Sequence, residues 1–290
     1  MIRCSVRRKT AVMGVTLGTV LAVAVTGCTR SSNAGKRPET LATPEVAASN
    51  SYIESAVLDL LGTTTPVLRL AEPGMCPGHF DIRPSQVNKL RACRLLLRFD
   101  FQDSLDSKLA GLTDRGLTIR AIRVTGGLCE PSSYQAVCRQ VAEALVTAGL
   151  IEKKDADSRL EKSITRLHEM AAWCRQQIAE ASLAGKSVVC SVHQEAFCRW
   201  LGLEIPATFT GADSASVGEI QETIRQTQGA NVELVVANLP EGRRLADALG
   251  QRLGVGVIVF GNFPVPTDGR LSFDDLLTAN VTQLVKAARH

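Results

Sequence analysis

Apolar positions along the chain form short runs rich in β-branched residues, which alternate with stretches of helical spacing. This alternation predicts parallel strands separated by helices. The strands are expected at 67–70, 95–99, 117–124, 187–192, 207–210, 232–237 and 255–260. The helices are expected at 85–91, 105–112, 132–148, 195–201, 217–228, 241–253 and 273–288. The predicted fold class is α/β, with two lobes that are each a mostly parallel sheet flanked by helices.

One stretch, from 155 to 183, breaks this alternation because it contains no Gly, no Pro and no strand pattern. Its apolar residues recur at steps of three and four, as on one face of a single long helix. They are Leu160, Ile164, Leu167, Ala171, Cys174 and Ile178. At 1.5 Å per residue such a helix would be about 40 Å long, enough to join two lobes. We therefore expect an N-terminal lobe over 50–154, a linker helix over 155–185 and a C-terminal lobe over 186–290.

The N-terminal segment has the order of a signal peptide, with a basic run up to Lys9 before an apolar stretch at 11–25. This stretch is shorter than the roughly 20 residues that a membrane-spanning helix requires. Directly after it, Val25-Thr26-Gly27-Cys28 resembles the lipobox of bacterial lipoproteins, in which the cysteine is lipidated. We predict a signal peptide over 1–27, a lipidated Cys28 and a flexible polar tether over 28–49. The protein is then an exported, membrane-anchored lipoprotein of the periplasm or cell surface.

Composition and charge narrow the class of protein. Hydrophobic residues make up 45% of the chain, which is enough for a large core and excludes wholesale disorder. The net charge of +4 includes the basic leader, so the remaining domain is near neutral and nothing indicates a nucleic-acid partner. The sequence also lacks the hydrolase nucleophile elbow, the P-loop, the zinc-protease helix motif and the dinucleotide fingerprint. We expect a binding protein and not an enzyme.

Seven of the nine cysteines remain once Cys4 in the leader and Cys28 at the anchor are set aside. They are Cys76, Cys93, Cys129, Cys138, Cys174, Cys190 and Cys198. In an oxidising exported compartment this number allows up to three disulfides and one free thiol. The alternative is that some of the sulfur atoms bind metal. The sequence leaves the pairing open.

Two histidines lie in loops that follow predicted strands. His79 ends the segment Cys76-Pro77-Gly78-His79, and His193 ends Cys190-Ser191-Val192-His193. Ligand sites in open α/β sheets form beyond the carboxyl ends of the strands. A histidine at such a point in each lobe therefore favours a metal site between them. The repeated Cys-x-x-His spacing also permits a closed zinc site of these two cysteines and two histidines.

The same loops resemble those of the zinc- and manganese-binding receptor proteins of bacterial ABC importers, which have two α/β lobes bridged by one long helix. The similar motifs are Gly78-His79-Phe80-Asp81-Ile82-Arg83-Pro84-Ser85, Glu130-Pro131 before a long helix, and Val192-His193-Gln194-Glu195-Ala196-Phe197. The resemblance implies that His79 and His193 are metal ligands.

Two of the four ligands expected from this resemblance are missing. Gly126 or Gly127 stands where the family usually supplies another histidine, and Asn262 stands where it supplies an acidic ligand. Asn238 likewise replaces a common glutamate. Two explanations stay open, namely a rebuilt metal site or a change to another ligand or an accessory role. The candidate ligands of a rebuilt site are His79, His193, Cys190, Cys129, Asn262 and Glu241.

The resemblance implies a monomeric receptor that captures a transition metal and delivers it to the membrane permease of an ABC importer. Thiolates and imidazoles favour Zn(II) or Cu(I) over Mn(II), so zinc is the expected metal, followed by Mn²⁺ or Cu⁺. Because metal binds the neutral imidazole, affinity should fall with decreasing pH. The alternative function is a non-transport binding lipoprotein with a degenerate metal site and structural disulfides.

Overall fold

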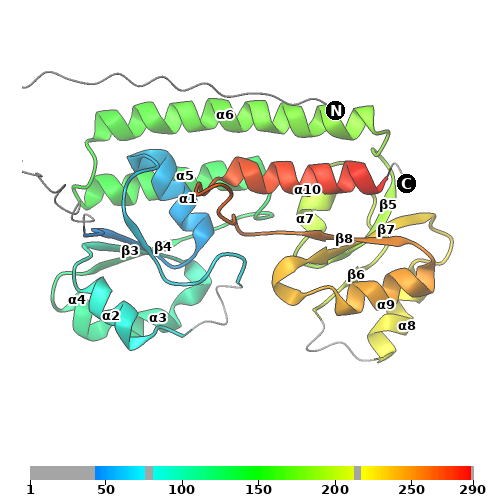
Figure 1. Ribbon diagram of the computed structural model, residues 1–290, viewed down its shortest axis with the longest axis horizontal. Coiled ribbons are helices and arrows are strands. Elements are labelled where there is room, and N and C mark those ends of the chain that lie inside the picture. Colours follow the sequence, from blue (N-terminus) through cyan, green and yellow to red (C-terminus); the bar gives the residue numbers. More distant parts are fainter. Residues whose placement is uncertain (1–42, 76–80, 212–216, 289–290) are drawn as a thin grey trace, which may run out of the picture. The chain divides into compact units, whose positions relative to one another are not determined.

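The computed structural model describes residues 43–75, 81–211 and 217–288 of the chain. The predicted signal peptide, the lipidation site Cys28 and the candidate ligand His79 lie outside these residues. The described residues form two parallel sheets of four strands each, with helices packed around them, and the long helix α6 joins the two lobes (Figure 1). This arrangement confirms the predicted fold class.

The sheet of the N-terminal lobe has the strand order β2-β1-β3-β4, and all neighbouring strands pair in parallel. Its strands are β1 Val46–Ala48, β2 Val67–Arg69, β3 Leu95–Phe99 and β4 Thr118–Ile122. Every residue of β3 is buried, as expected for an inner strand covered on both faces. The edge strand β4 is largely exposed.

The sheet of the C-terminal lobe repeats this topology with the parallel order β6-β5-β7-β8. Its strands are β5 Ser187–Ser191, β6 Thr208–Phe209, β7 Val232–Asn238 and β8 Gly256–Phe260. The strand order reverses between β1 and β3 in one sheet and between β5 and β7 in the other. Ligands of open α/β sheets bind at the carboxyl ends of strands at such a switch point.

Helices connect the strands, and α6 Lys153–Glu180 has 28 residues, as its apolar spacing predicts. Leu167, Cys174 and Ile178 of this helix are buried against the core. The remaining α-helices are α1 Ser51–Leu61, α2 Pro84–Leu90, α3 Ser104–Lys108, α4 Ala110–Thr113, α5 Pro131–Thr147, α7 Glu195–Trp200, α8 Val217–Gln226, α9 Arg244–Leu253 and α10 Phe273–Ala287.

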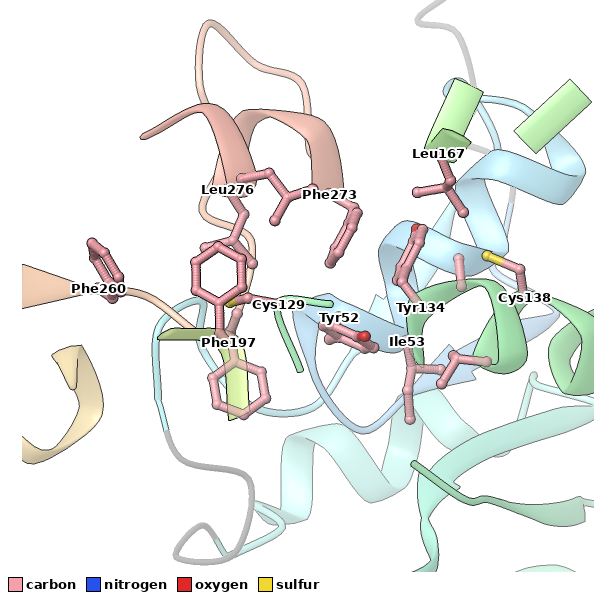
Figure 2. Close-up of a cluster of buried hydrophobic side chains, with 14 of the residues drawn as sticks. Tyr52, Ile53, Cys129, Tyr134, Cys138, Leu167, Phe197, Phe260, Phe273 and Leu276 are labelled. Atoms are coloured by element: carbon pink, nitrogen blue, oxygen red, sulfur yellow. The ribbon is translucent and has the colours of Figure 1, made fainter. Parts of the chain in front are cut away.

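The largest cluster of buried side chains draws on both lobes and on α6. At its centre Tyr134 of α5 stacks on Phe273 of α10, with ring centroids 3.9 Å apart and an angle of 2° between the planes (Figure 2). Tyr52 of α1 packs edge-on against both rings. Each such aromatic contact adds about 0.5–1.5 kcal/mol beyond the area that it buries. The two lobes therefore share a core.

A polar network links α6 to helices that pack against each sheet. Arg166 of α6 lies 2.6 Å from Asp59 of α1 and 3.4 Å from Asp274 of α10. The Tyr134 hydroxyl donates a hydrogen bond of 2.9 Å to the same Asp59 carboxylate. Burial raises the pKa of Asp274, and the Arg166 guanidinium opposes this shift. The positive charge of Arg166 thus compensates two carboxylates, which come from helices of different lobes.

Several local features differ from the sequence prediction. The helix α1 Ser51–Leu61 lies where no helix is expected. The tether is predicted to extend to residue 49, but Val46–Ala48 form β1, an inner strand of the sheet. A three-residue strand is too short to give a periodic signal. The helix expected at 105–112 is instead the pair α3 and α4, which meet at Leu109 with non-helical φ and ψ of −112° and 6°. Within the described residues, no helix is both long and apolar enough to cross a membrane.

Candidate metal-binding site

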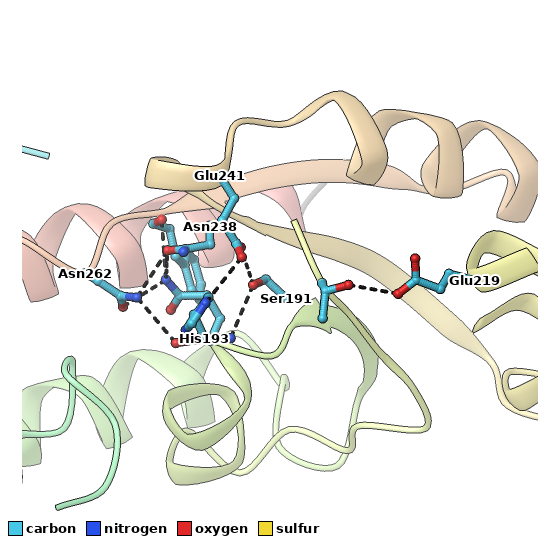
Figure 3. Close-up of polar contacts among 9 residues, drawn as sticks. Ser191, His193, Glu219, Asn238, Glu241 and Asn262 are labelled. Carbon is cyan, nitrogen blue, oxygen red and sulfur yellow. Dashed lines mark hydrogen bonds and ion pairs between the residues drawn. The ribbon is translucent and has the colours of Figure 1, made fainter. Parts of the chain in front are cut away.

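His193 and Glu241, two of the predicted ligands, face each other at the carboxyl ends of adjacent strands (Figure 3). His193 follows β5 by two residues, and Glu241 ends the 3₁₀ turn η3 Leu239–Glu241, which follows β7. These strands are the neighbours at the switch point of their sheet. The Nε2 atom of His193 lies 3.4 Å from Oε1 of Glu241, and the two side chains are 60% and 19% exposed. An imidazole nitrogen and a carboxylate oxygen thus meet at the site that the topology favours.

Ser191, the last residue of β5, contacts both of these residues. Its hydroxyl donates a hydrogen bond of 2.6 Å to Oε2 of Glu241 and accepts one of 3.2 Å from the backbone N–H of His193. Ser191 is fully buried. The carboxylate is therefore held through one oxygen, while its other oxygen faces the imidazole.

Next to His193, three neutral amide side chains form a buried network. The Nε2 group of Gln194 donates hydrogen bonds of 3.0 Å to the side-chain oxygens of Asn238 and Asn262. Asn262 in turn donates to the Asn238 oxygen at 3.1 Å. The three residues are at most 4% exposed, and Oε1 of Gln194 has no hydrogen-bond partner among the residues that the structure describes. This part of the site therefore contributes no charge to balance that of a metal ion.

Asn262, also a predicted ligand, uses its polar atoms within the protein. Its oxygen accepts a hydrogen bond from Gln194 and lies 3.6 Å from the Cys129 sulfur. Its nitrogen donates to Asn238 and to the backbone oxygen of His193. An amide oxygen offers two lone pairs, and Gln194 occupies one of them. In this arrangement Asn262 orients the His193 loop, and its side chain is held within the amide network.

The predicted ligands Cys129 and Cys190 are both fully buried. The Cys129 thiol donates to the backbone oxygen of Gly261 at 3.1 Å and accepts from Asn280 at 3.5 Å. Burial raises the pKa of Cys129 well above its ordinary value. Because metals bind the thiolate, a metal at Cys129 would have to displace this buried proton. Cys190 lies in the hydrophobic core with Cys198 as a hydrogen-bonding neighbour.

The described cysteines are all free and buried. They are Cys93, Cys129, Cys138, Cys174, Cys190 and Cys198. The structural disulfides expected for an exported protein are therefore not formed among them. These cysteines lie in the apolar core as small hydrophobic side chains, where Cys190 and Cys198 are hydrogen-bonding neighbours.

Neighbouring atoms leave little space at Gly126 and Gly127, where the resemblance places another histidine. A Cβ atom on Gly127 would lie 3.0 Å from the Cβ of Ala196 and 3.2 Å from the backbone nitrogen of Phe197, both in α7. At Gly126 the φ of +89° is one that other residues rarely adopt, and a Cβ would lie 2.8 Å from the Ser133 hydroxyl. These glycines allow the loop before α5 to contact α7, and no space remains there for an imidazole.

The structure brings some of the predicted ligands together and leaves others apart. Across 43–75, 81–211 and 217–288, no group of three or more His, Cys, Asp or Glu side chains could hold a metal ion. His193 and Glu241 form a pair, Cys129 and Asn262 meet in the adjacent amide network, and Cys190 is separate in the core. Cys76 and His79 lie outside these ranges.

Sequence reasoning misses Ser191 and Gln194, although both are fully buried polar residues at the site. The available signal is their position directly beside His193 in otherwise apolar surroundings. A buried polar side chain requires hydrogen-bond partners. Those partners lie on β7, directly after it and after β8, 44 or more residues away, so only the sheet order identifies them.

Fold and site together define a two-lobed α/β binding protein. A model of the family described as "Zinc-uptake complex component A periplasmic", or ZnuA, matches residues 129–287. The chain belongs to this family, which confirms the resemblance seen in its motifs. The matched range contains α6, the C-terminal sheet, His193 and Glu241. Membership supports a periplasmic metal-binding component of an uptake complex. A comparison with curated proteins gave no match.

Solved structures of metal-binding proteins share the fold. A structure of ZnuA is 13% identical, with a TM-score of 0.69 over 85% of this chain and 99% of the other. The Mn-bound periplasmic metal binding protein from Candidatus Liberibacter asiaticus is 14% identical, with a TM-score of 0.68 over 84% and 98%. The substrate-binding protein FpvC from Pseudomonas aeruginosa, in complex with Mn²⁺, is 14% identical, with a TM-score of 0.67 over 85% and 99%.

Proposed function

We propose that this protein is an extracytoplasmic receptor that binds zinc and delivers it to the permease of an ABC importer. His193 and Glu241 are its first ligands, and His79 is the ligand that the N-terminal lobe contributes. The observation that carries this proposal is the His193–Glu241 pair, whose facing atoms lie 3.4 Å apart at the switch point of the C-terminal sheet. The ion is cargo, and the protein performs no chemistry on it.

The ligand types support zinc in preference to manganese or copper. Zinc accepts histidine nitrogen and carboxylate oxygen in a tetrahedral site of few ligands. Manganese favours oxygen-rich octahedral sites, and the nearby amide network offers Mn²⁺ no second carboxylate. Cu⁺ favours thiolates, whereas the Cys129 thiol is fully buried and donates to the backbone oxygen of Gly261.

The proposed anchor and partner follow from the predicted lipidation. A lipid on Cys28 and a polar tether would keep the receptor near a membrane permease at high effective concentration. Replacing Cys28 with Ser should move the protein from the membrane fraction to the soluble fraction, while leaving zinc affinity unchanged.

Zinc titration of the mature protein by calorimetry tests the function. We expect about one ion bound per chain, and we expect His193→Ala or Glu241→Ala to remove most of the affinity because each deletes a ligand. Exposed residues of the same types on α6, changed as His168→Ala and Glu169→Ala, are the matched controls and should bind as the wild type does. Wild-type protein without stoichiometric zinc, or unchanged affinity in both site variants, would contradict the proposal.

One observation favours a second candidate, a binding lipoprotein with an accessory role and no metal cargo. The closed position at Gly127 and the neutral side chains of Asn238 and Asn262 remove charge and ligands from the site. The calorimetric experiment separates the two functions. A protein with an accessory role and no metal cargo would give no heat of zinc binding at zinc concentrations close to the protein concentration.

A further inference from the structure

The hydroxyl of Ser191 connects both proposed ligands through a single buried atom. It accepts the backbone N–H of His193 at 3.2 Å and donates to Oε2 of Glu241 at 2.6 Å (Figure 3). A hydroxyl has one proton to donate, so the acceptor of that proton is the carboxylate. The effect is to turn Oε1 of Glu241, the oxygen without the serine bond, toward His193.

The backbone at Gly211 restricts the same carboxylate from another side. A Cβ atom at this position would lie 2.9 Å from the Cβ, the Cγ and the Oε1 atoms of Glu241. A side chain there would displace Glu241, because real Cβ atoms do not approach other atoms so closely. Glu241 therefore lies between a hydrogen bond from β5 and a glycine that follows β6.

We infer that Ser191 is a positioning residue of the metal site, and that it acts by holding the Glu241 carboxylate and the His193 loop in the geometry for binding. This inference rests on the proposed function. Ser191 touches no metal itself. It fixes the orientation of Glu241 before the ion arrives, so the ion does not have to order a mobile glutamate side chain.

The sequence context explains why this role falls to β5. Ser191 ends a strand whose other inner residues are apolar, and its side chain is fully buried. A buried hydroxyl at this point needs a partner, and Glu241 supplies it across the switch point. The two ligands and their support thus come from two adjacent parallel strands, whose relative position the sheet hydrogen bonds fix.

The test compares zinc affinities of the mature protein with Ser191→Ala, Ser191→Thr and Ser49→Ala. Ser191→Ala should weaken binding by about 10–100-fold, the usual effect of losing a hydrogen bond to a metal ligand. Ser191→Thr keeps the hydroxyl and should restore much of the affinity. Ser49 is a matched control, because it is a fully buried serine directly after β1 whose hydroxyl accepts a hydrogen bond from Asn50. Its alanine variant should bind zinc as the wild type does.

A double-mutant cycle distinguishes positioning from general loss of structure. If Ser191 acts largely through Glu241, then Ser191→Ala should weaken zinc binding much less in a Glu241→Ala background than in the wild type. Gly211→Ala displaces the same carboxylate without touching Ser191 and should also lower the affinity. It serves as the independent variant if Ser191→Ala does not fold.

The outcomes separate this inference from the proposed function. Absence of zinc binding in the wild type overturns the function and the inference together. Two results overturn the inference alone, provided that the wild type binds zinc. One is a zinc affinity of Ser191→Ala within about twofold of the wild-type affinity. The other is an equal loss of zinc affinity on Ser191→Ala in the wild-type and Glu241→Ala backgrounds. A loss that is confined to the background with Glu241 intact supports it.

Discussion

Individual residues determine the charge of the candidate site. Asn238 and Asn262 occupy positions where the resemblance places acidic side chains, and they bond to each other and to Gln194 instead of facing a ligand. Glu241 provides a carboxylate on the loop after the neighbouring strand β7. The negative charge available to a metal therefore comes from Glu241 and not from the positions of Asn238 and Asn262.

Substitution of Gly127 tests how tightly the chain packs at the position where the resemblance places a histidine. Gly127→Ala should lower the free energy of unfolding by about 1–3 kcal/mol, because the new methyl group is forced against Ala196 and the backbone of Phe197. Gly111→Ala is the control, since nothing lies within 4 Å of a Cβ atom there. Urea denaturation of both variants measures the difference. Equal stability of the two variants would show that the α7 contact is not tight.

At the scale of elements, α6 and its arginine fasten the two lobes. Arg166 reaches Asp59 of α1 and Asp274 of α10, and both carboxylates are less than a quarter exposed. The Tyr134–Phe273 stack lies in the same shared core. This combination of ion pairs and aromatic contacts keeps the helices of the two lobes together.

Removal of Arg166 should therefore reduce stability, and more so at neutral than at acidic pH. We expect Arg166→Met to destabilise the fold by about 2–4 kcal/mol at pH 7, because two partly buried carboxylates lose their counter-ion. The folded-state pKa of Asp274 is already raised by burial and should rise further. A carboxyl group whose pKa is higher in the folded state stabilises the fold when it is protonated. This contribution is fully present below the unfolded-state pKa near 3.9, and it is lost as pH rises through the folded-state pKa.

Denaturation at pH 4 and pH 7 measures this effect. Lys153→Met, which breaks an exposed ion pair with Asp157 on the same helix, is the control and should change stability by less than about 1 kcal/mol at either pH. An Arg166→Met penalty that is the same at both pH values would mean that Asp59 and Asp274 are not the groups that Arg166 compensates.

The elements that the sequence predicts well are those whose apolar spacing extends over several residues. The strands β3, β5 and β7 and the helix α6 repeat their pattern long enough to be identified. β1 is missed because Val46–Ala48 is too short to have a period, although it is an inner strand. The site is predicted only in part for a related reason. His193 stands out by residue type, but the partners of Ser191 and Gln194 depend on which strands are neighbours.

At the scale of the whole molecule, two lobes of the same topology share one core, and the ZnuA family match spans α6 and the C-terminal lobe. The solved relatives that bind zinc, manganese or cadmium share this fold. The C-terminal lobe presents His193 and Glu241 as a preformed pair at its switch point. The central claim is that a zinc ion binds there through nitrogen and oxygen ligands, and not through the buried thiols.

X-ray absorption spectroscopy at the zinc edge of the loaded mature protein tests this claim most directly. We expect a first shell of nitrogen and oxygen atoms at about 2.0–2.1 Å, with the outer scattering of imidazole and without sulfur. The spectrum of His193→Ala should lose imidazole scattering. A zinc–sulfur shell at about 2.3 Å in the wild-type protein would contradict binding through nitrogen and oxygen alone and return the cysteines to the ligand set.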